Sequence, residues 1–343
     1  MAEETIVVIG AGIIGLSAAL RIQECASRKQ RVLIIAREFP SDRSPNYASS
    51  WAGAHYRYVP EDTEQEIREA QWANKSYAVF VSQLANEPEC GIGFFDHYEY
   101  FPAPSPTYLN LKACPALPNF RVLEKSELPE GIKHGYLYDS WCINSPLYCE
   151  HLLRKFELKG GKTMKYQLQA PEEVFVLVPN AKTVVNASGK GFNDPAVFIS
   201  RGQTVTVSNP CDRTVTQQNE DGSWSYIIPR PLNGGTLIGG TKQANNWDPN
   251  PDPAVLERML RDAAHMHPAM LNAEGGFDIV RQSVGRRPMR GDGMRLEIEE
   301  KGDAKRVVHS YGACGRGYEL SWGVADEVIK MVFGKDADAK ASL

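Results

Sequence analysis

Residues 5–22 read TIVVIGAGIIGLSAALRI, which is a short apolar run, three spaced glycines and a helix-like stretch. Residues 5–9 have the pattern of a buried strand, and the helix-like stretch runs from Leu16 to about Ala26. A second buried-strand pattern, RVLIIA, follows at residues 31–36. The order strand, turn, helix, strand predicts a βαβ unit at the beginning of the chain.

The three glycines of this unit, Gly10, Gly12 and Gly15, form the pattern G-x-G-x-x-G. The first permits a tight turn, the second lets the backbone approach a pyrophosphate, and the third lets the helix pack on the strand. The helix then offers free N–H groups and the positive end of its dipole to phosphate. Glu38 follows the second strand, where an acidic side chain accepts hydrogen bonds from ribose hydroxyls. We predict a dinucleotide site; the alternatives are a glycine turn without a ligand and a solvated glutamate.

The composition limits the class of protein. The chain has 343 residues, 42% hydrophobic and 23% charged, which is typical of a globular protein of about two domains. Its formal net charge of -4 argues against nucleic acid as a partner. No membrane partner is expected, because no apolar run reaches about 18 residues, and the acidic beginning Met-Ala-Glu-Glu does not favour a secretory signal. The seven scattered cysteines indicate buried thiols in a reducing compartment and no metal site.

Further blocks follow in order along almost the whole chain. They are VVIGAGIIG at 7–15, ASSWAGA at 48–54, VVNASG at 184–189, RGQ at 201–203, YIIPRP at 226–231, GGT at 239–241, VGRRP at 284–288, and YG, GY and SWG between 311 and 323. This ordered set resembles the D-amino-acid oxidase and D-aspartate oxidase family of flavoproteins, in particular its fungal members.

The resemblance implies an α/β fold with two interleaved domains. A Rossmann-like FAD-binding domain is expected from residues 1–56, 145–200 and 280–334. An α+β substrate-binding domain with a large mixed sheet is expected from residues 57–144 and 201–279, and residues 335–343 are expected to form a loose tail. Helical patterns cover 62–85, 145–159, 253–266 and 321–333.

The resemblance also implies a non-covalently bound FAD. The matching positions expected to bind it are Gly10, Gly12, Ile13, Ile14, Gly15, Arg37, Glu38, Ala48, Ser49, Gly53, Ser188, Gly312, Gly315, Gly317 and Tyr318.

The reaction implied by the resemblance is oxidative deamination of a D-amino acid. A hydride passes from the substrate Cα to the flavin, and O₂ then reoxidises the flavin, so that the products are a 2-oxo acid, ammonia and hydrogen peroxide. The protein mainly positions the Cα–H bond, so no catalytic side-chain base is expected. The alternatives are a non-catalytic FAD-binding relative and another flavin amine oxidase, such as a glycine or sarcosine oxidase.

Three positions match the family's contacts to the amino acid backbone of the substrate. Arg287 matches the arginine that binds the α-carboxylate, for which a planar fork of donors is needed. Its neighbour Arg286 stands where relatives usually carry an apolar residue, and since strand neighbours point to opposite faces, only Arg287 is expected to face the pocket. Tyr226 matches a tyrosine that also contacts the carboxylate. A backbone carbonyl of the 312–317 turn, around Gly315, is expected to accept the substrate amine.

The side-chain specificity rests on other residues. Lys242 follows Gly-Gly-Thr, where the D-aspartate oxidases have a basic residue and members for neutral substrates tend to have an aromatic one. His55 is a second candidate donor to a side-chain carboxylate, and Arg316 and Arg213 are candidates near the mouth of the pocket. A charged hydrogen bond of about 1.5–3 kcal/mol favours an acidic substrate roughly ten- to over a hundredfold.

These residues predict D-aspartate as the preferred substrate, and the alternative is broad oxidation of neutral D-amino acids. Lys242 as a surface lysine and His55 in a packing role are the corresponding structural alternatives. Cys314 is interpreted as a small buried filler, with a redox thiol as its alternative.

The end of the chain reads Ala341-Ser342-Leu343, which resembles a peroxisomal S-K-L signal without its basic residue. We therefore expect a peroxisomal import receptor as a partner and a peroxisomal location, with the cytoplasm as the alternative. The segment from Glu297 to Val307 is short, so the dimer that some yeast-type relatives build with a long loop there is not expected. A homo-oligomer of another kind stays open.

Overall fold

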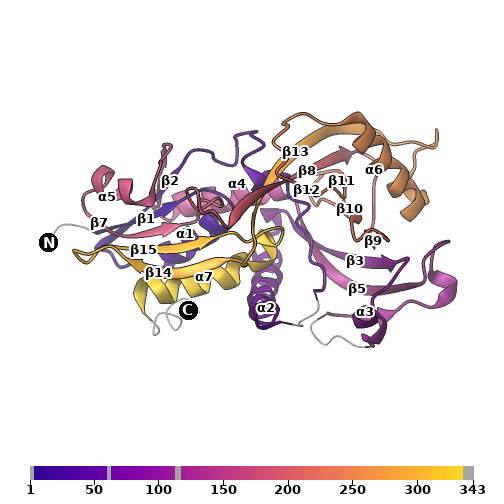
Figure 1. The fold of residues 1–343 in the computed structure, drawn as a ribbon, viewed down its shortest axis with the longest axis horizontal. Coiled ribbons are helices and arrows are strands. Elements are labelled where there is room, and N and C mark those ends of the chain that lie inside the picture. The colour runs from indigo at the N-terminus through magenta and orange to yellow at the C-terminus, as the bar shows by residue number, and fades with distance from the viewer. Residues whose placement is uncertain (1–3, 60–62, 113–116, 335–343) are drawn as a thin grey trace.

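The computed structural model describes residues 4–59, 63–112 and 117–334, and it contains two β-sheets (Figure 1). The smaller sheet lies on the left of Figure 1 and has six strands. In spatial order they are β14 (Arg295–Glu300), β15 (Arg306–Tyr311), β7 (Ala181–Asn186), β1 (Glu4–Ile9), β2 (Gln30–Ala36) and β6 (Lys162–Lys165). All neighbours are parallel except β14 and β15, so the carboxyl ends of the five parallel strands share one edge.

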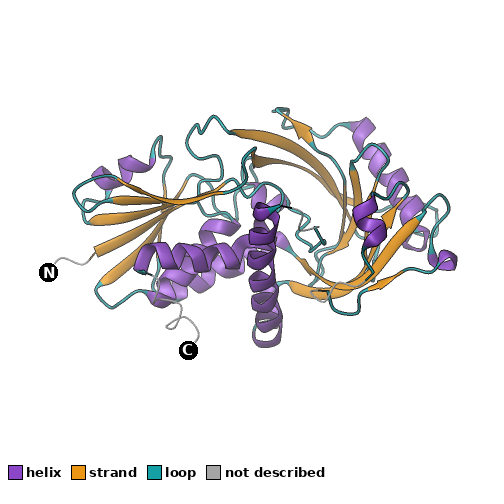
Figure 2. Ribbon diagram, turned by 60° about the horizontal axis from the view of Figure 1, so that its bottom comes forward, coloured by secondary structure: helices purple, strands orange, loops and turns teal. Residues whose placement is uncertain are grey.

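The larger sheet has nine strands and is strongly curved (Figure 2). In spatial order they are β12 (Gln243–Ala244), β8 (Val197–Val207), β11 (Thr236–Gly239), β10 (Trp224–Pro229), β9 (Thr214–Gln218), β3 (Ile92–Phe101), β5 (His134–Ile143) and β4 (Arg121–Val122), and β13 (Ile279–Arg290) pairs with β8. The sheet is mixed, because β3 is parallel to β9 whereas the other neighbours are antiparallel.

Helices cover the two sheets separately. They are α1 (Ile13–Cys25), α2 (Glu64–Asn86), α3 (Pro106–Asn110), α4 (Ser145–Leu158), α5 (Val174–Leu177), α6 (Pro253–Met266) and α7 (Gly317–Phe333). α1 packs against α4 and α7, and α2 packs against α7. Gly323 makes the last contact close, since a Cβ atom there would lie 2.3 Å from the Trp72 Cα atom.

Apolar side chains form a core under each sheet. On the smaller sheet, alternate residues of β1, such as Ile6 and Val8, pack with Leu16 and Leu20 of α1. Under the larger sheet, α6 packs its buried side chains on Val205, Ile227 and Ile238. Each fully buried apolar side chain of this size stabilises the fold by about 1.5–3 kcal/mol.

The α/β class and the large mixed sheet are confirmed, and the domain division stays a prediction, because some segments expected in one domain contact elements expected in the other. β13 belongs to the larger sheet, although residues 280–290 were expected in the FAD-binding domain. α2 packs against α7 of the smaller sheet's layer, although residues 64–86 were expected in the substrate-binding domain. In Figure 1, α2 lies between the two sheets.

Residues 301–305 join β14 to β15 as a short hairpin connection, so no long loop projects there. Across the described parts of the chain, no helix combines the length and the apolar character that a membrane crossing needs. The expected tail at 335–343, with its Ala341-Ser342-Leu343 ending, lies outside the described residues.

Candidate active site

The glycine turn between β1 and α1 is closely packed backbone. Gly10 has a φ of +100°, and a Cβ atom there would lie 2.5 Å from the Ala187 carbonyl oxygen. A Cβ atom on Gly15 would lie 2.0 Å from the Gly10 carbonyl oxygen. Both positions therefore require glycine, the first also for its backbone conformation. Gly15, which was expected to bind FAD, lies within α1 and does not line the cavity; it allows the helix to pack against the turn.

The loop 46–52 fixes the N-terminus of α1. Gly12 is the N-cap, and a Cβ atom on it would lie 3.0 Å from Ser49 Oγ. That oxygen accepts a 2.9 Å hydrogen bond from the Ile13 backbone N–H, and the Tyr47 hydroxyl donates one of 2.6 Å to the Ala11 carbonyl. The positive end of the α1 dipole thus meets a glycine surface that a phosphate can approach.

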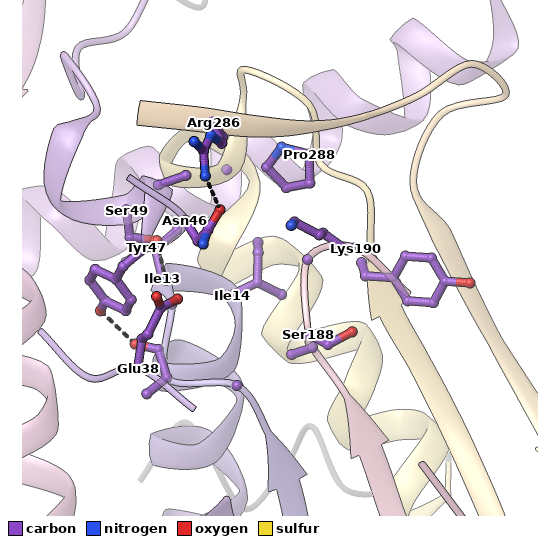
Figure 3. A pocket seen from close by; sticks show the side chains of 18 of the residues that line it. Ile13, Ile14, Glu38, Asn46, Tyr47, Ser49, Ser188, Lys190, Arg286 and Pro288 are labelled. Atoms are coloured by element: carbon purple, nitrogen blue, oxygen red, sulfur yellow. Dashed lines mark hydrogen bonds between the residues drawn. The ribbon is translucent and has the colours of Figure 1, made fainter. Parts of the chain in front are cut away.

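A cavity of about 430 Å³ begins at this turn. Its walls come from the carboxyl ends of β1, β2 and β7, from loop 46–52, from β8 and β13, and from the turn before α7 (Figure 3). Of the positions expected at the cofactor or the substrate, those that line it are Gly10, Gly12, Ile13, Ile14, Arg37, Glu38, Ala48, Ser49, Ser188, Arg287, Gly312, Gly315, Gly317 and Tyr318.

Glu38 lies just beyond the carboxyl end of β2, and its side chain points into the cavity beside Ile13 (Figure 3). One of its carboxylate oxygens lies 2.9 Å from Nη2 of Arg37. The ion pair orients the carboxylate, and its side chain is only 18% exposed. This geometry suits acceptance of hydrogen bonds from a ribose.

The turn before α7 closes the cavity on the other side. Gly312 has a φ of +82°, and a Cβ atom there would lie 2.9 Å from the Cβ atom of Arg290. Gly317 begins α7 against Ile13, where a Cβ atom would lie 3.3 Å from the isoleucine Cγ2 atom. Between them, Gly315 also lines the cavity. The close backbone of this turn offers carbonyl oxygens that can accept hydrogen bonds from an amine.

Arg287 lies on β13 opposite Ser200 of β8 and lines the cavity. Its guanidinium lies over Gly202, where a Cβ atom would be 2.5 Å from Nη1. Nη1 donates a 3.1 Å hydrogen bond to the Thr241 carbonyl oxygen. It forms no ion pair with a carboxylate within the described ranges, so the remaining donors of the fork are available to a carboxylate ligand.

The expectation that only one of the two adjacent arginines faces the cavity is wrong. Arg286 lines it as well, and its Nη1 donates a 2.8 Å hydrogen bond to Asn46 Oδ1 (Figure 3). Side chains alternate along β13, but the long arginine side chain brings its guanidinium back to the cavity from the other face of the strand. The alternation of residues along a strand specifies only the direction of each Cα–Cβ bond. It does not specify where the guanidinium at the end of an arginine side chain lies.

Tyr226 and His55 lie together next to the cavity but are not part of its lining. Tyr226 of β10 packs over Gly239 of β11, where a Cβ atom would lie 2.4 Å from the tyrosine hydroxyl oxygen. The ring centroids of His55 and Tyr226 are 6.0 Å apart. Gly53, which was expected at FAD, lies outside the lining and instead makes room for Ile228, since a Cβ atom there would be 2.7 Å from the Ile228 Cδ1 atom.

His55 borders a buried polar cluster. Burial lowers the pKa of His55 to about 3 and also lowers the pKa of His97, so both rings are neutral near pH 7. Burial raises the pKa of Glu99 to about 7, although Arg57 Nη1 lies 3.6 Å from its carboxylate. His55 Nε2 is buried and has no hydrogen-bond partner in the described structure. A buried nitrogen without a partner calls for an explanation, and a polar group of a ligand is one that would satisfy it.

Lys242 is exposed and directly follows Thr241, the residue that Arg287 contacts. Burial raises the pKa of the Cys314 thiol, and the nearby charge of Lys242 opposes this rise. Cys314 lines the cavity, whereas Lys242 lies outside the lining. The buried Arg201 fixes the segment by donating to the Gln243 side chain at 2.6 Å and the Asp248 carbonyl at 2.9 Å.

Arg316, expected near the substrate, lies outside the cavity lining and is held in a partly buried network of ion pairs. Its Nε donates a 2.8 Å hydrogen bond to Glu319, and its Nη1 lies 2.7 Å from a Glu69 oxygen. Burial alone would lower the pKa of Arg316, but the two carboxylates raise it above its usual value. The network ties α7 to α2, so this guanidinium is already engaged. Arg213 is likewise paired, with Asp212 at 2.8 Å.

Cys314 packs in the turn with a protonated thiol. Its Sγ donates weakly to the Gly312 carbonyl at 3.4 Å, and burial raises its pKa. A protonated, hydrogen-bonded thiol is a poor nucleophile and a poor redox group. We expect Cys314→Ala to keep its flavin and its turnover, measured against the unaltered protein at equal flavin content. A variant that keeps flavin but loses turnover would give this thiol a chemical role.

Several residues of the cavity were missed from the sequence. They are Asn46, Tyr47, Gln167, Leu168, Lys190 and Thr204. The sequence could have indicated some of these residues, because Gln167 and Leu168 directly follow strand β6 and Lys190 follows strand β7. Ligands of such sheets gather where parallel strands end. Only the arrangement in space shows which of the loop residues reach inward.

The residues present fit an FAD molecule. Such a ligand needs a carboxylate for its ribose, a helix N-terminus for its phosphates and a wall of backbone for its flavin ring. Glu38, the turn from Gly10 to Ile14 and the turn from Gly312 to Gly317 supply these around one cavity. A Cβ atom at Gly10 would lie 2.5 Å from the Ala187 carbonyl oxygen and one at Gly12 would lie 3.0 Å from Ser49 Oγ, so the turn that faces the phosphates depends on both glycines.

Comparison with known proteins agrees with this fit. A family model described as "FAD dependent oxidoreductase" and called DAO matches residues 5–331. The chain is 40% identical over 354 residues to the D-aspartate oxidase of Talaromyces thermophilus, with 96% of this chain and 95% of that protein covered. It is 31% identical over 340 residues to the D-amino-acid oxidase of Schizosaccharomyces pombe, with 96% of each covered. A glycine oxidase structure from Geobacillus kaustophilus superposes with a TM-score of 0.75 at 18% identity, covering 96% of this chain and 95% of that one, and shows the shared fold.

Proposed function

Because this chain belongs to the DAO family of FAD-dependent oxidoreductases, we propose that it deaminates acidic D-amino acids oxidatively, D-aspartate first. The substrate, O₂ and water become a 2-oxo acid, ammonia and hydrogen peroxide. Similarity to a D-aspartate oxidase over nearly the full length supports the acidic preference. The S. pombe relative, a D-amino-acid oxidase, supports the coarser statement that the substrate is a D-amino acid.

One observation carries the acidic preference. Arg287 donates to the carbonyl of Thr241, and Lys242 is the next residue along the chain. Arg287 and Lys242 are linked in this way through Thr241, which supports a site that offers a fork to one carboxylate and an ammonium to another. D-Aspartate has two carboxylates a short distance apart, so its charges match this pair of cations.

The chain's own residues position the substrate. Arg287 binds the α-carboxylate, and the Tyr226 hydroxyl donates a second hydrogen bond to it. Lys242 and the free Nε2 of His55 meet the side-chain carboxylate, and a carbonyl of the 312–317 turn accepts from the amine. When bound, FAD supplies the acceptor for the hydride of the substrate Cα and the route for electrons to O₂. Glu38 would hold its ribose, and the N-terminus of α1 would hold its diphosphate.

The substrate preference can be tested with Lys242→Met. We expect kcat/KM for D-aspartate to fall about ten- to a hundredfold, because one charged hydrogen bond is lost. The rate with D-alanine, which has no side-chain carboxylate, should not change. Peroxide production is measured with D-aspartate, D-glutamate, D-alanine and D-valine, with the L-isomers as controls.

Lys182→Met is the matched control, because Lys182 is an exposed lysine on β7, in the other sheet. It should leave every rate unchanged. Preference of the unaltered protein for D-alanine or D-valine would overturn the acidic assignment and favour broad oxidation of neutral D-amino acids. Bound flavin without turnover of any D-amino acid would overturn the oxidase itself.

The address and the assembly of the protein are further proposals. We propose a peroxisomal location on the basis of Ala341-Ser342-Leu343 and of the peroxide that the reaction produces. The test is the location of a fluorescent fusion with and without these residues. For assembly, the short 301–305 connection supports the absence of a dimer built from a long loop at that place.

A further inference from the structure

Two cations of the cavity have no acidic partner. Lys190 follows β7, Arg286 lies on β13, and both line the cavity. Arg286 binds the Asn46 side chain and the Trp247 carbonyl oxygen, which are neutral groups. Over the described ranges, neither cation forms an ion pair with a carboxylate. The charge of Arg286 acts on Asp248, but the Asp248 side chain is exposed and the two residues form no ion pair.

Trp247 holds the two cations near each other. Lys190 Nζ lies 4.6 Å and Arg286 Cζ lies 5.2 Å from the centre of its ring. Each contact is attractive, but the cations repel one another. Burial, Arg37 and then Arg286 lower the pKa of Lys190, and the charge of Glu38 only partly opposes them. Arg286 Nε is also buried without a hydrogen-bond partner. Such an arrangement is stabilised when an anion lies between the cations.

The place of these side chains points to the anion. Lys190 follows the Ala187–Gly189 segment that packs on Gly10, and its ammonium is directed toward Ile14 and Pro288 (Figure 3). Arg286 binds Asn46 in the same loop that caps α1 through Ser49. Both cations therefore border the N-terminus of α1, where a phosphate is favoured.

A charge count of the cavity agrees. Its lining includes four cationic side chains and one carboxylate, namely Arg37, Lys190, Arg286, Arg287 and Glu38. Arg37 and Glu38 neutralise each other, and the proposed function assigns Arg287 to the substrate carboxylate. Two positive charges are left, and the diphosphate of FAD carries two negative ones.

We propose that Lys190 and Arg286 clamp the diphosphate of FAD together with the N-terminus of α1, and that Trp247 spaces the two cations. Arg201 supports the clamp, because it fixes the loop that carries Trp247 through the Asp248 carbonyl. This inference rests on FAD as the cofactor and not on the identity of the substrate. Lys190 and Arg286 are thus cofactor-binding residues.

The test is the affinity of the apo-protein for FAD. Arg286→Leu, Lys190→Met and the double variant are titrated with FAD by flavin fluorescence at several NaCl concentrations. We expect each single change to raise Kd about ten- to a hundredfold, because a charge-assisted contact to phosphate is lost. The slope of log Kd against log salt should also become shallower, since fewer ionic contacts remain to be screened.

Two further variants keep the test independent of folding. Arg286→Lys and Lys190→Arg preserve the charge and should retain most of the salt dependence. Lys305→Met is the matched control, since Lys305 also lies on an aromatic ring, 5.4 Å from the Phe175 centroid, but outside the cavity lining. It should leave the FAD Kd unchanged. Circular dichroism of each apo-protein shows whether it is folded.

The phosphorus signals of bound FAD give a second readout that needs no turnover. In ³¹P NMR spectra of the holoprotein, the diphosphate resonances should shift in Arg286→Leu and Lys190→Met but not in Lys305→Met. Unchanged Kd, salt slope and phosphorus spectra in the double variant would overturn the clamp. A higher KM for D-aspartate at unchanged FAD affinity would instead assign Arg286 to the substrate. FAD binding that depends on the two cations and on salt as expected, without oxidation of any D-amino acid, would support the clamp and overturn the proposed function.

Discussion

Replacement of Arg287 by leucine is expected to lower kcat/KM for D-aspartate by roughly thirtyfold to several thousandfold, because truncating one partner of a hydrogen-bonded charge pair costs about 2–5 kcal/mol. Arg287 forms no ion pair in the described structure, and its fork faces the cavity. Leucine would remove both parallel donors and leave the substrate carboxylate against an apolar wall. The loss should be similar for D-alanine, since every amino acid has the α-carboxylate.

Steady-state peroxide assays at saturating FAD measure this effect. Arg287→Lys is the matched control: it keeps the charge but not the planar fork, so its activity should lie between those of the other two proteins. The visible flavin spectrum of each variant shows that the cofactor is retained. Full activity of Arg287→Leu would mean that the substrate carboxylate binds elsewhere.

Gly10→Ala is expected to have the second large effect, on FAD. The φ of +100° is unfavourable for alanine, and the new Cβ atom would lie 2.5 Å from the Ala187 carbonyl oxygen. Strain of about 1–2 kcal/mol and overpacking of about 1–3 kcal/mol add up to a loss of roughly thirtyfold or more in FAD affinity, if the turn must open to relieve them. Fluorescence titration of the apo-protein measures the loss, and the midpoint of thermal unfolding shows how much of it affects the fold.

Gly302→Ala separates backbone strain from the local clash. Gly302 also has a positive φ, +77°, but a Cβ atom there would have no atom within 4 Å. It lies in the β14–β15 hairpin, away from the cavity lining. This variant should bind FAD as tightly as the unaltered protein. Equal FAD affinity in Gly10→Ala would show that the turn does not carry the phosphates.

The elements of the fold followed from local patterns. The helical patterns at 62–85 and 253–266 match α2 and α6 closely, because each has a cap, Thr63 and Asp252, that fixes its beginning. α7 begins at Gly317, before the expected residue 321, because its first residues directly continue the glycine-rich segment 312–317, which favoured a turn. The place of β13 could not be derived, because pairing with β8 depends on contacts distant in sequence.

The candidate site likewise contains residues that a local motif predicts and residues that only the folded chain brings together. Motif residues such as Gly12 and Glu38 lie in the cavity wall because a local backbone pattern specifies them. Arg316 shows the limit: its neighbours in sequence suggest a cavity, whereas its partner Glu69 comes from a distant helix. Lys190 and Arg286 belong to no shared motif, and only the folded chain brings them together around Trp247.

If the cavity brings a D-amino acid to the flavin as a reductant, the substrate alone reduces the flavin. The decisive experiment is to mix the oxidised holoprotein with D-aspartate without O₂ and to record the flavin absorbance. We predict rapid bleaching by D-aspartate, slower bleaching by D-alanine and none by L-aspartate, followed by recovery of the oxidised spectrum and release of hydrogen peroxide when O₂ is admitted. A flavin that stays oxidised with every D-amino acid, in a folded holoprotein, would contradict the account.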